Sequence, residues 1–290
     1  MLEYTLQLLA SALTEGSIYV LMALGLVIIY RSTEVLYFNQ GSIAMIGGIS
    51  LYAFLNHTGI PLAIAIPASL AVCIVVALLS QWLVVLPLLA RGVSSLNVSI
   101  ITIGIAMILE TAVMMLFGKD PLPVSSFSGD DPLTIFGASI VPQHLWIVGL
   151  TALALVLTLL FFKKTWTGRA MTGLGDNHLL ARASGFPIKR LFTYSFIFAA
   201  LVGGLAGIAS APISYTSYAV GTRLTIKGFV AAAVGGMGSP VGALVGGLII
   251  GFFEVFTAGF ISSNLKDLIT ILLLLLVLKL RPEGLMGERG

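Results

Sequence analysis

Glycine is concentrated in one stretch of the chain, AAVGGMGSPVGALVGGLIIGFFE, which covers residues 232–254. A glycine-rich turn that leads into a helix can bind phosphate, because the free backbone amides point at the anion. This stretch lacks the lysine of a GxxxxGK[ST] loop, and Val241 stands where a GxGxxG pattern requires its third glycine. Phosphate binding is therefore the weaker of two interpretations.

The other interpretation is close packing between membrane helices, which small residues at four-residue spacing permit. Pro240 suits the first turn of a helix, so a tight turn is predicted just before it. We expect this helix to make its contacts through two adjacent stripes of glycine. The stripes are Gly238, Gly242 and Gly246, and Gly247 and Gly251.

Three acidic side chains, Glu15, Glu110 and Glu254, are set in apolar sequence. Ionisable residues inside membrane spans are costly and usually face a protein interior or a solute pathway. Each also has a structural interpretation, as a hydrogen-bonding group between helices or a residue near the headgroups. Glu15 would lie at the interface if residues 4–14 formed a surface helix. Glu254 lies about four turns beyond Pro240, a depth that favours a packing or pathway role.

No constellation for catalysis or metal binding appears in the sequence. His57, His144 and His178 are far apart and not at metal-ligand spacing. Cys73 is the one cysteine, so no intrachain disulfide can form, and its apolar neighbours indicate a buried filler. We expect no bound metal, no cofactor and no enzymatic activity.

The composition requires a lipid environment for these residues. Of 290 residues, 58% are hydrophobic and 9% are charged, whereas soluble domains carry roughly 25% charged residues. So little charge cannot cover a globular surface in water. The formal charge of +3 is better explained by membrane orientation than by nucleic-acid binding.

The elements that must position these residues are membrane helices, each needing roughly 17–25 apolar residues. The sequence predicts an all-α fold, a polytopic transmembrane bundle with about eight or nine membrane elements, some short or broken, in a single domain over residues 1–290. Clear spans lie near 5–30, 60–90, 95–117, 144–162, 190–211, 240–260 and 264–281, and shorter ones near 41–56 and 222–237.

The orientation follows from the distribution of lysine and arginine, which favour cytoplasmic loops. Basic residues gather in 163–190, near Arg91 and after the last span, whereas the loop 118–143 carries Asp120, Asp130 and Asp131 around a single lysine. We therefore expect 163–190, the 91–94 turn and the C-terminus to be cytoplasmic. The 118–143 loop and the N-terminus are expected outside.

The basic loop reads KKTWTGRAMTGLGDNHLLARASGFPIKR. Asp176 can cap a short helix over about 177–184, and Gly185 and Pro187 would end it. Gly173 and Gly175 would let the chain turn to present this helix to a soluble partner. The alternative is a solvated basic loop that only fixes topology.

Four segments along nearly the whole chain carry a family resemblance. They are EGSIYVLMALGLVIIYRS (15–32), the AxxxG of Ala181 and Gly185, KGFVAAAVGGMGSPVGALVGGLIIGFFE (227–254) and LKDLITILLLLLVLKLRPEGLMG (265–287). These segments resemble the inner-membrane permeases of branched-chain amino-acid ABC transporters and their relatives for urea and short amides.

Two positions depart from the family pattern. After the first helix the family usually has Asn-Phe-Ala-His-Gly, and this chain reads YFNQG, so Tyr37 and Gln40 replace the Asn and the His. Leu179 stands where docking loops often have an acidic residue. Through the resemblance, Phe38, Asn39 and Gln40 become candidate pathway residues beside the three glutamates.

The resemblance implies a translocation subunit in the cytoplasmic (inner) membrane. It would pair with a second permease subunit, identical or homologous, with two cytoplasmic ATP-binding subunits and with an extracytoplasmic solute-binding protein. The chain has no GxxxxGK[ST] loop, so any ATP must be hydrolysed by another chain. The resemblance also implies that residues 163–190 dock on the ATPase. The candidate docking residues are Arg169, Asp176, Ala181, Arg182 and Gly185.

Two other functions fit parts of the sequence. A stand-alone secondary transporter or channel shares the composition and the broken helices. A membrane-embedded enzyme or assembly factor is the weakest alternative, because no catalytic cluster supports it.

Overall fold

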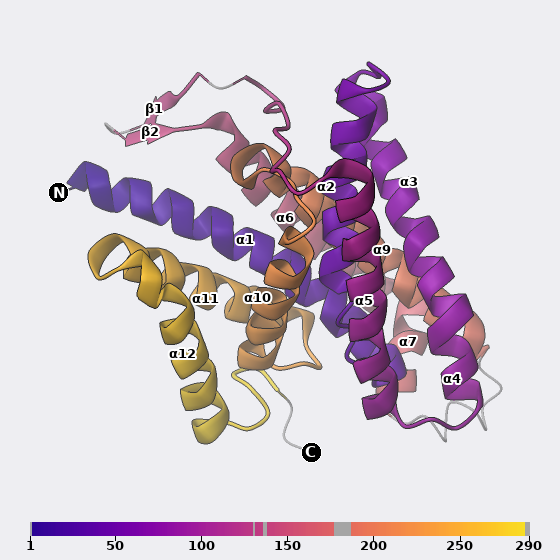
Figure 1. Cartoon of the computed structure of the whole chain (residues 1–290). Helices are drawn as coiled ribbons and strands as arrows, with labels where there is room; N and C mark the ends of the chain where they lie inside the picture. Colours follow the sequence, from indigo (N-terminus) through magenta and orange to yellow (C-terminus); the bar gives the residue numbers. More distant parts are fainter. Residues whose placement is uncertain (1, 130, 136–137, 177–186, 288–290) are drawn as a thin grey trace.

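A computed structural model describes residues 2–129, 131–135, 138–176 and 187–287. Within these ranges the chain folds into packed helices with one small hairpin (Figure 1). The helices are α1 (Leu2–Thr33), α2 (Gln40–Asn56), α3 (Leu62–Ser80), α4 (Leu86–Ala90), α5 (Ser95–Phe117), α6 (Pro142–Lys164), α7 (Trp166–Asp176), α9 (Ile188–Ser214), α10 (Val220–Gly235), α11 (Pro240–Phe260) and α12 (Lys266–Leu280). The antiparallel strands β1 (Leu133–Ile135) and β2 (Ala138–Ile140) lie in the predicted outside loop.

The predicted polytopic bundle is confirmed. Six helical stretches are long and apolar enough to cross a membrane: Glu3–Thr33, Leu62–Ala90, Ser95–Phe117, Pro142–Lys164, Ile188–Ser214 and Pro240–Phe260. The helices α2, α10 and α12 are shorter, with 17, 16 and 15 residues. Because each rises about 1.5 Å per residue, none of the three reaches the roughly 30 Å of a hydrocarbon core. Neighbouring helices cover α2 and α10, whose residues are mostly buried, as short membrane helices require.

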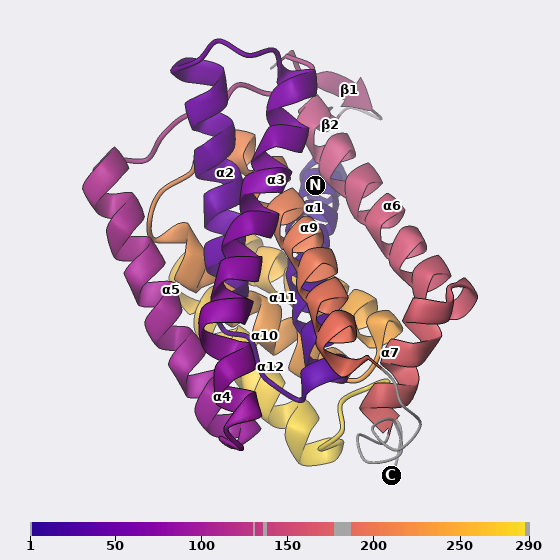
Figure 2. The same cartoon turned by 90° about the vertical axis from the view of Figure 1, so that its right-hand side faces the viewer.

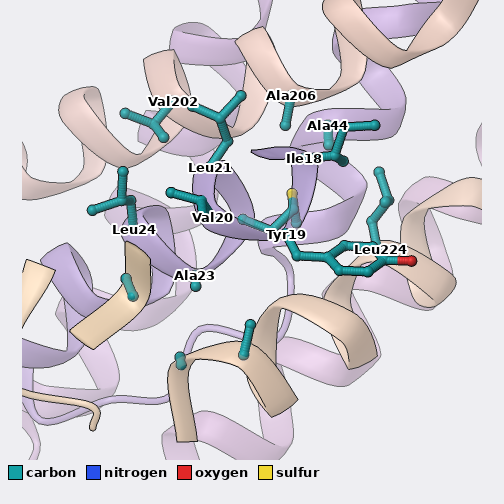
Figure 3. Close-up of a cluster of buried hydrophobic side chains, with 14 of the residues drawn as sticks. Ile18, Tyr19, Val20, Leu21, Ala23, Leu24, Ala44, Val202, Ala206 and Leu224 are labelled. Carbon is teal, nitrogen blue, oxygen red and sulfur yellow. The ribbon is translucent and has the colours of Figure 1, made fainter. Parts of the chain in front are cut away.

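Helix α1 is the centre of the fold, because neighbouring helices bury most of its membrane-spanning stretch. Val20, Leu21, Met22 and Leu24 are fully buried. In Figure 3 the side chain of Leu21 lies near Val202 and Ala206 of α9, Ile18 lies near Ala44 of α2, and Tyr19 lies near Leu224 of α10. Residues 4–14, considered as a surface helix before Glu15, form the first part of a single helix that ends at Thr33.

The outer helices expose apolar side chains. On α5, Met115 and Leu116 are each 78% exposed, and α3 and α6 present further leucines, isoleucines and valines. Figure 2 shows α3, α5 and α6 on the outside of the bundle, around α1 and α9. Surfaces of this kind are solvated by lipid tails in a membrane protein.

The span Leu62–Ala90 is not a uniform α-helix. Residues Gln81–Val85 form a π-helical turn between α3 and α4. Pro87, which lacks an amide hydrogen, follows directly in α4. The side chain of Gln81 is buried and donates to Thr193 of α9 at 3.3 Å.

The glycines of α11 face two different neighbouring helices. A Cβ added at Gly242 or Gly246 would collide with the backbone of α10 around Gly235. A Cβ added at Gly247 or Gly251 would collide with the backbone of α1 around Val20 and Gly16. The two stripes therefore hold the chain's own helices together.

Gly238 stands apart from this arrangement. A Cβ there would meet nothing within 4 Å, because Gly238 lies in the turn before Pro240, where no second backbone approaches. Its assignment to the packing stripe is wrong for that reason.

The structure also corrects the start of the basic loop. Asp176 is the last residue of α7, and Gly173 and Gly175 are helical and form no turn. An added Cβ on Gly175 would collide with the carbonyl oxygen of Arg31 at the end of α1. The short helix predicted for 177–184 lies outside the described residues.

The glycine contacts give a stability prediction. Gly251→Ala should lower the free energy of unfolding by about 1–3 kcal/mol, because the new methyl group must displace the backbone of α1. The matched control is Gly104→Ala on α5, where the added Cβ meets nothing within 4 Å. This control should gain up to about 1 kcal/mol from the helix preference of alanine. Thermal unfolding in detergent measures both, and equal midpoints would refute the contact.

Candidate functional site

Two neighbouring hollows meet at α10. The larger, which we name the α10 groove, has a volume of about 540 Å³ and lies between α5, α10 and α12; in Figure 1 α10 stands between the other two helices. The smaller, the Glu254 pocket, has a volume of about 90 Å³ and reaches α1 and α11. Arg223 and Lys227 line both hollows. They are four residues apart on α10, which places them on one face of the helix.

Lys227 is the centre of a buried ion-pair cluster. Its Nζ lies 2.9 Å from Glu254 Oε2 and also donates to Asp267 Oδ1. The hydroxyl of Tyr19 donates to the same Glu254 oxygen at 2.9 Å, and Lys266 Nζ lies 3.6 Å from Glu254 Oε1. The cluster therefore joins α1, α10, α11 and α12.

Because Lys227 and Glu254 are buried, their charges must be paired. The side chains of Lys227 and Glu254 are 8% and 7% exposed. A charge taken out of water at membrane depth is very costly unless it is paired and hydrogen-bonded. Each of the two charges supplies the partner that the other requires.

The remaining predicted glutamates lie beside this cluster. Glu15 lines the Glu254 pocket, one turn before Tyr19 on α1. Glu110 lines the α10 groove from α5, where its Oε1 accepts from the hydroxyl of Thr222 at 2.6 Å. The fold thus brings Glu15, Glu110 and Glu254, which are far apart in sequence, to two adjoining hollows.

Sequence reasoning missed Arg223 and the role of Lys227. Both belong to GTRLTIKG at the start of a short span. The signal that could have identified them is the pair of basic residues one helical turn apart in a predicted membrane span. Their acidic partners could be found only from the three-dimensional arrangement.

The segment YFNQG lies elsewhere and is largely packed inside the protein. Asn39 Nδ2 donates to the hydroxyl of Tyr37 at 2.9 Å, and Gln40 Nε2 donates to the carbonyl of Ala199 at 2.8 Å. Both side chains are fully buried, and neither lines a described hollow. In this conformation Asn39 and Gln40 fix the break between α1 and α2 instead of lining a path.

Phe38 reaches a third hollow at the opposite end of α1. This hollow, of about 710 Å³, is lined by the last turn of α1, the first turns of α5 and Gly175 of α7. The ring of Phe38 also contacts Phe229 of α10, with centroids 5.5 Å apart. Phe38 is thus separated from the three glutamates.

Only part of the predicted docking loop is described. Arg169 is an exposed residue of α7, and Asp176 ends that helix. Gly168 packs on the backbone of Phe161 and Phe162, and Gly175 packs on Arg31. Ala181, Arg182 and Gly185 lie outside the described residues.

Among the described residues, no group of three or more His, Cys, Asp or Glu side chains could hold a metal ion. Cys73 is buried, and its thiol faces the carbonyl of Ile43 at 3.4 Å.

Comparisons with known proteins give a consistent family. Residues 8–278 match the family described as branched-chain amino acid transport system / permease component. The chain is 29% identical, over 98% of its own length and 96% of the relative, to the high-affinity branched-chain amino acid transport system permease protein LivH of Escherichia coli K12. The same identity and coverage hold for BraD of Pseudomonas aeruginosa.

More distant proteins also resemble this chain. The ribose import permease protein RbsC of Escherichia coli K12 is 24% identical over 87% of this chain and 78% of its own. Among solved structures, PsaBC from Streptococcus pneumoniae in complex with Fab matches with a TM-score of 0.52 at 16% identity. The match covers 97% of this chain and 92% of that chain.

The ion-pair cluster gives a second prediction. Lys227→Met should destabilise the protein by about 3–5 kcal/mol, because it leaves Glu254 as a buried charge without its main partner. Adding Glu254→Gln should recover much of this loss, since the amide is neutral and can still accept from Tyr19. Thermal unfolding of the purified protein measures both variants.

The matched control is Lys266→Met, since Lys266 is half-exposed and lies farther from Glu254. It should change stability by less than about 1 kcal/mol. A Lys227→Met variant as stable as this control would contradict the buried pairing.

Proposed function

Because the chain belongs to the family of branched-chain amino acid transport system permease components, we propose that it is the membrane-spanning permease subunit of an ABC importer. Its solute is a branched-chain amino acid or a related small polar molecule. The observation that carries the proposal is the family match over residues 8–278, which includes every membrane helix up to the last turn of α12. The charged hollows at membrane depth support it, because such residues mark solute pathways.

The importer requires partners that this chain does not replace. We infer two cytoplasmic ATP-binding subunits, a second permease subunit and an extracytoplasmic solute-binding protein. The absence of a GxxxxGK[ST] loop from the full sequence supports separate ATPase chains.

Residues 163–190 dock on the ATPase in this proposal, and α7 transmits the movement. Its contacts at Gly168 and Gly175 join it to α6 and to the end of α1. Helix α1 in turn carries Glu15 and Tyr19 into the Glu254 pocket. A displacement of α7 would therefore reach the charged hollows through one continuous helix.

The orientation in the cytoplasmic membrane follows from the basic residues. The ends of α4, α6 and α12 carry Arg91, Lys163, Lys164 and Lys279, so we place them and the C-terminus on the cytoplasmic side. The β1–β2 hairpin and the α11–α12 connection then face the outside, where the solute-binding protein would dock.

A buried Lys–Glu cluster would also suit a stand-alone, ion-coupled transporter. Reconstitution separates the two functions. Proteoliposomes that contain this chain with its permease partner, ATPases and binding protein should take up labelled L-leucine only with ATP. Uptake by this chain alone, driven by an ion gradient, would contradict the ABC importer.

The docking role is tested by substitution in the loop. Arg182→Glu combined with Gly185→Leu should abolish uptake and leave membrane insertion and abundance unchanged, because the change affects only the ATPase contact. The matched control is Thr58→Ala, at an exposed position between α2 and α3, which should transport normally. Normal uptake by the double variant would overturn the docking assignment.

A further inference from the structure

The α10 groove combines a carboxylate and a guanidinium, neither of which forms a salt bridge among the described residues, with an apolar wall. Glu110 interacts with Thr222, and Arg223 takes part in none of the salt bridges among the described residues. Lys227 and Asp267, which also line the groove, are ion-paired with each other, and Lys227 is also paired with Glu254. The groove therefore offers one carboxylate and one guanidinium to a ligand.

The helix geometry keeps these two charges from pairing with each other. Thr222 and Arg223 are consecutive in α10, so their side chains point about 100° apart around the helix axis. Thr222 is directed at Glu110 on α5, and Arg223 is therefore directed away from it, into the space that the groove shares with the Glu254 pocket.

The remaining walls are apolar. Ile226 and Val230 follow Arg223 along α10, and Ile271 faces them from α12. Ile226 and Ile271 are about half exposed in the single chain. They offer an aliphatic surface next to the two charges.

Lipid tails alone are an unfavourable occupant of this groove. Glu110 lies seven residues before the end of α5, roughly 10 Å along the helix, and an unpaired charge in contact with hydrocarbon is strongly unfavourable. A zwitterion with an aliphatic tail complements the lining of the groove. Its ammonium group can bind Glu110, its carboxylate can bind Arg223, and its tail can contact the apolar side chains.

We propose that the α10 groove is a transit subsite for an aliphatic α-amino acid, with Glu110 binding the ammonium group, Arg223 the carboxylate, and Ile226, Val230 and Ile271 the side chain. The subsite rests on the proposed import function and assigns residues to it. It is large enough for a solute and water, at about 540 Å³, so binding would be weak and release easy.

The test is protection of an engineered thiol in the complete transporter. Ala219→Cys places a small reactive group on the exposed mouth of the groove without removing a proposed contact, and the native Cys73 is buried. Labelling by a charged methanethiosulfonate should be slowed by L-leucine. Isoamylamine and 4-methylpentanoate, which each lack one charge, should protect much less.

Substitutions assign the two charges. Glu110→Gln and Arg223→Gln, each in the Ala219→Cys background, should raise the leucine concentration for half protection at least about tenfold. Thr58→Cys, remote from the groove, should be labelled at a rate that leucine does not change.

The outcomes separate this subsite from the import function. If the unsubstituted transporter imports leucine with ATP while Ala219→Cys is unprotected, or is inaccessible because a second subunit fills the groove, the subsite is wrong and the import function stands. Full protection in both charge variants would equally overturn it. Absence of ATP-driven leucine import by the unsubstituted transporter would overturn the function on which the subsite depends.

Discussion

The close backbone contact between α11 and its two neighbours is the constraint on which the rest of the structure depends. Gly247 and Gly251 admit α1, and Gly242 and Gly246 admit α10, so α11 holds both helices at a distance that larger side chains would forbid. Glu254 lies one turn beyond Gly251 and points between the same two helices. The tight packing therefore delivers the carboxylate to Lys227 and Tyr19.

The ion-pair cluster in turn explains how a short α12 stays attached. Leu273, Leu274 and Val277 of α12 pack against the core, and many of its other large side chains are exposed. Its first two residues, Lys266 and Asp267, contact Glu254 and Lys227. Charges at the start of α12 thus hold it beside α10, and this position forms one wall of the α10 groove.

The sequence predicted the membrane elements well, because length and apolarity report directly on spanning helices. The spans expected at 95–117 and 240–260 coincide with α5 and α11, and the short element expected at 41–56 is α2.

The three glutamates could be identified from the sequence because a charge inside a membrane span is costly, but the residues that contact them could not. Lys227 and Glu254 are 27 residues apart and Glu110 is much farther away, and only the packed helices bring these segments together. The surroundings of Asn39 and Gln40 could not be predicted from the sequence either, since polar residues near a helix break can be buried by hydrogen bonds to a neighbouring helix.

The length of helix α1 restricts where the helix bundle can move. Helix α1 has 32 residues, about 48 Å, and connects α7 at one end with the Glu254 pocket. A rigid helix cannot absorb a displacement along its length, so movement must be taken up where helical hydrogen bonding is interrupted.

Two interruptions lie beside α1 and α9. Residues 34–39 break the chain after α1, with Glu34 at a φ of 57°, a conformation that side chains other than glycine seldom adopt. The π-helical turn Gln81–Val85 interrupts the α3–α4 span next to α9. Phe38 and the buried Asn39 belong to the first interruption, which separates the end of α1 from the start of α2.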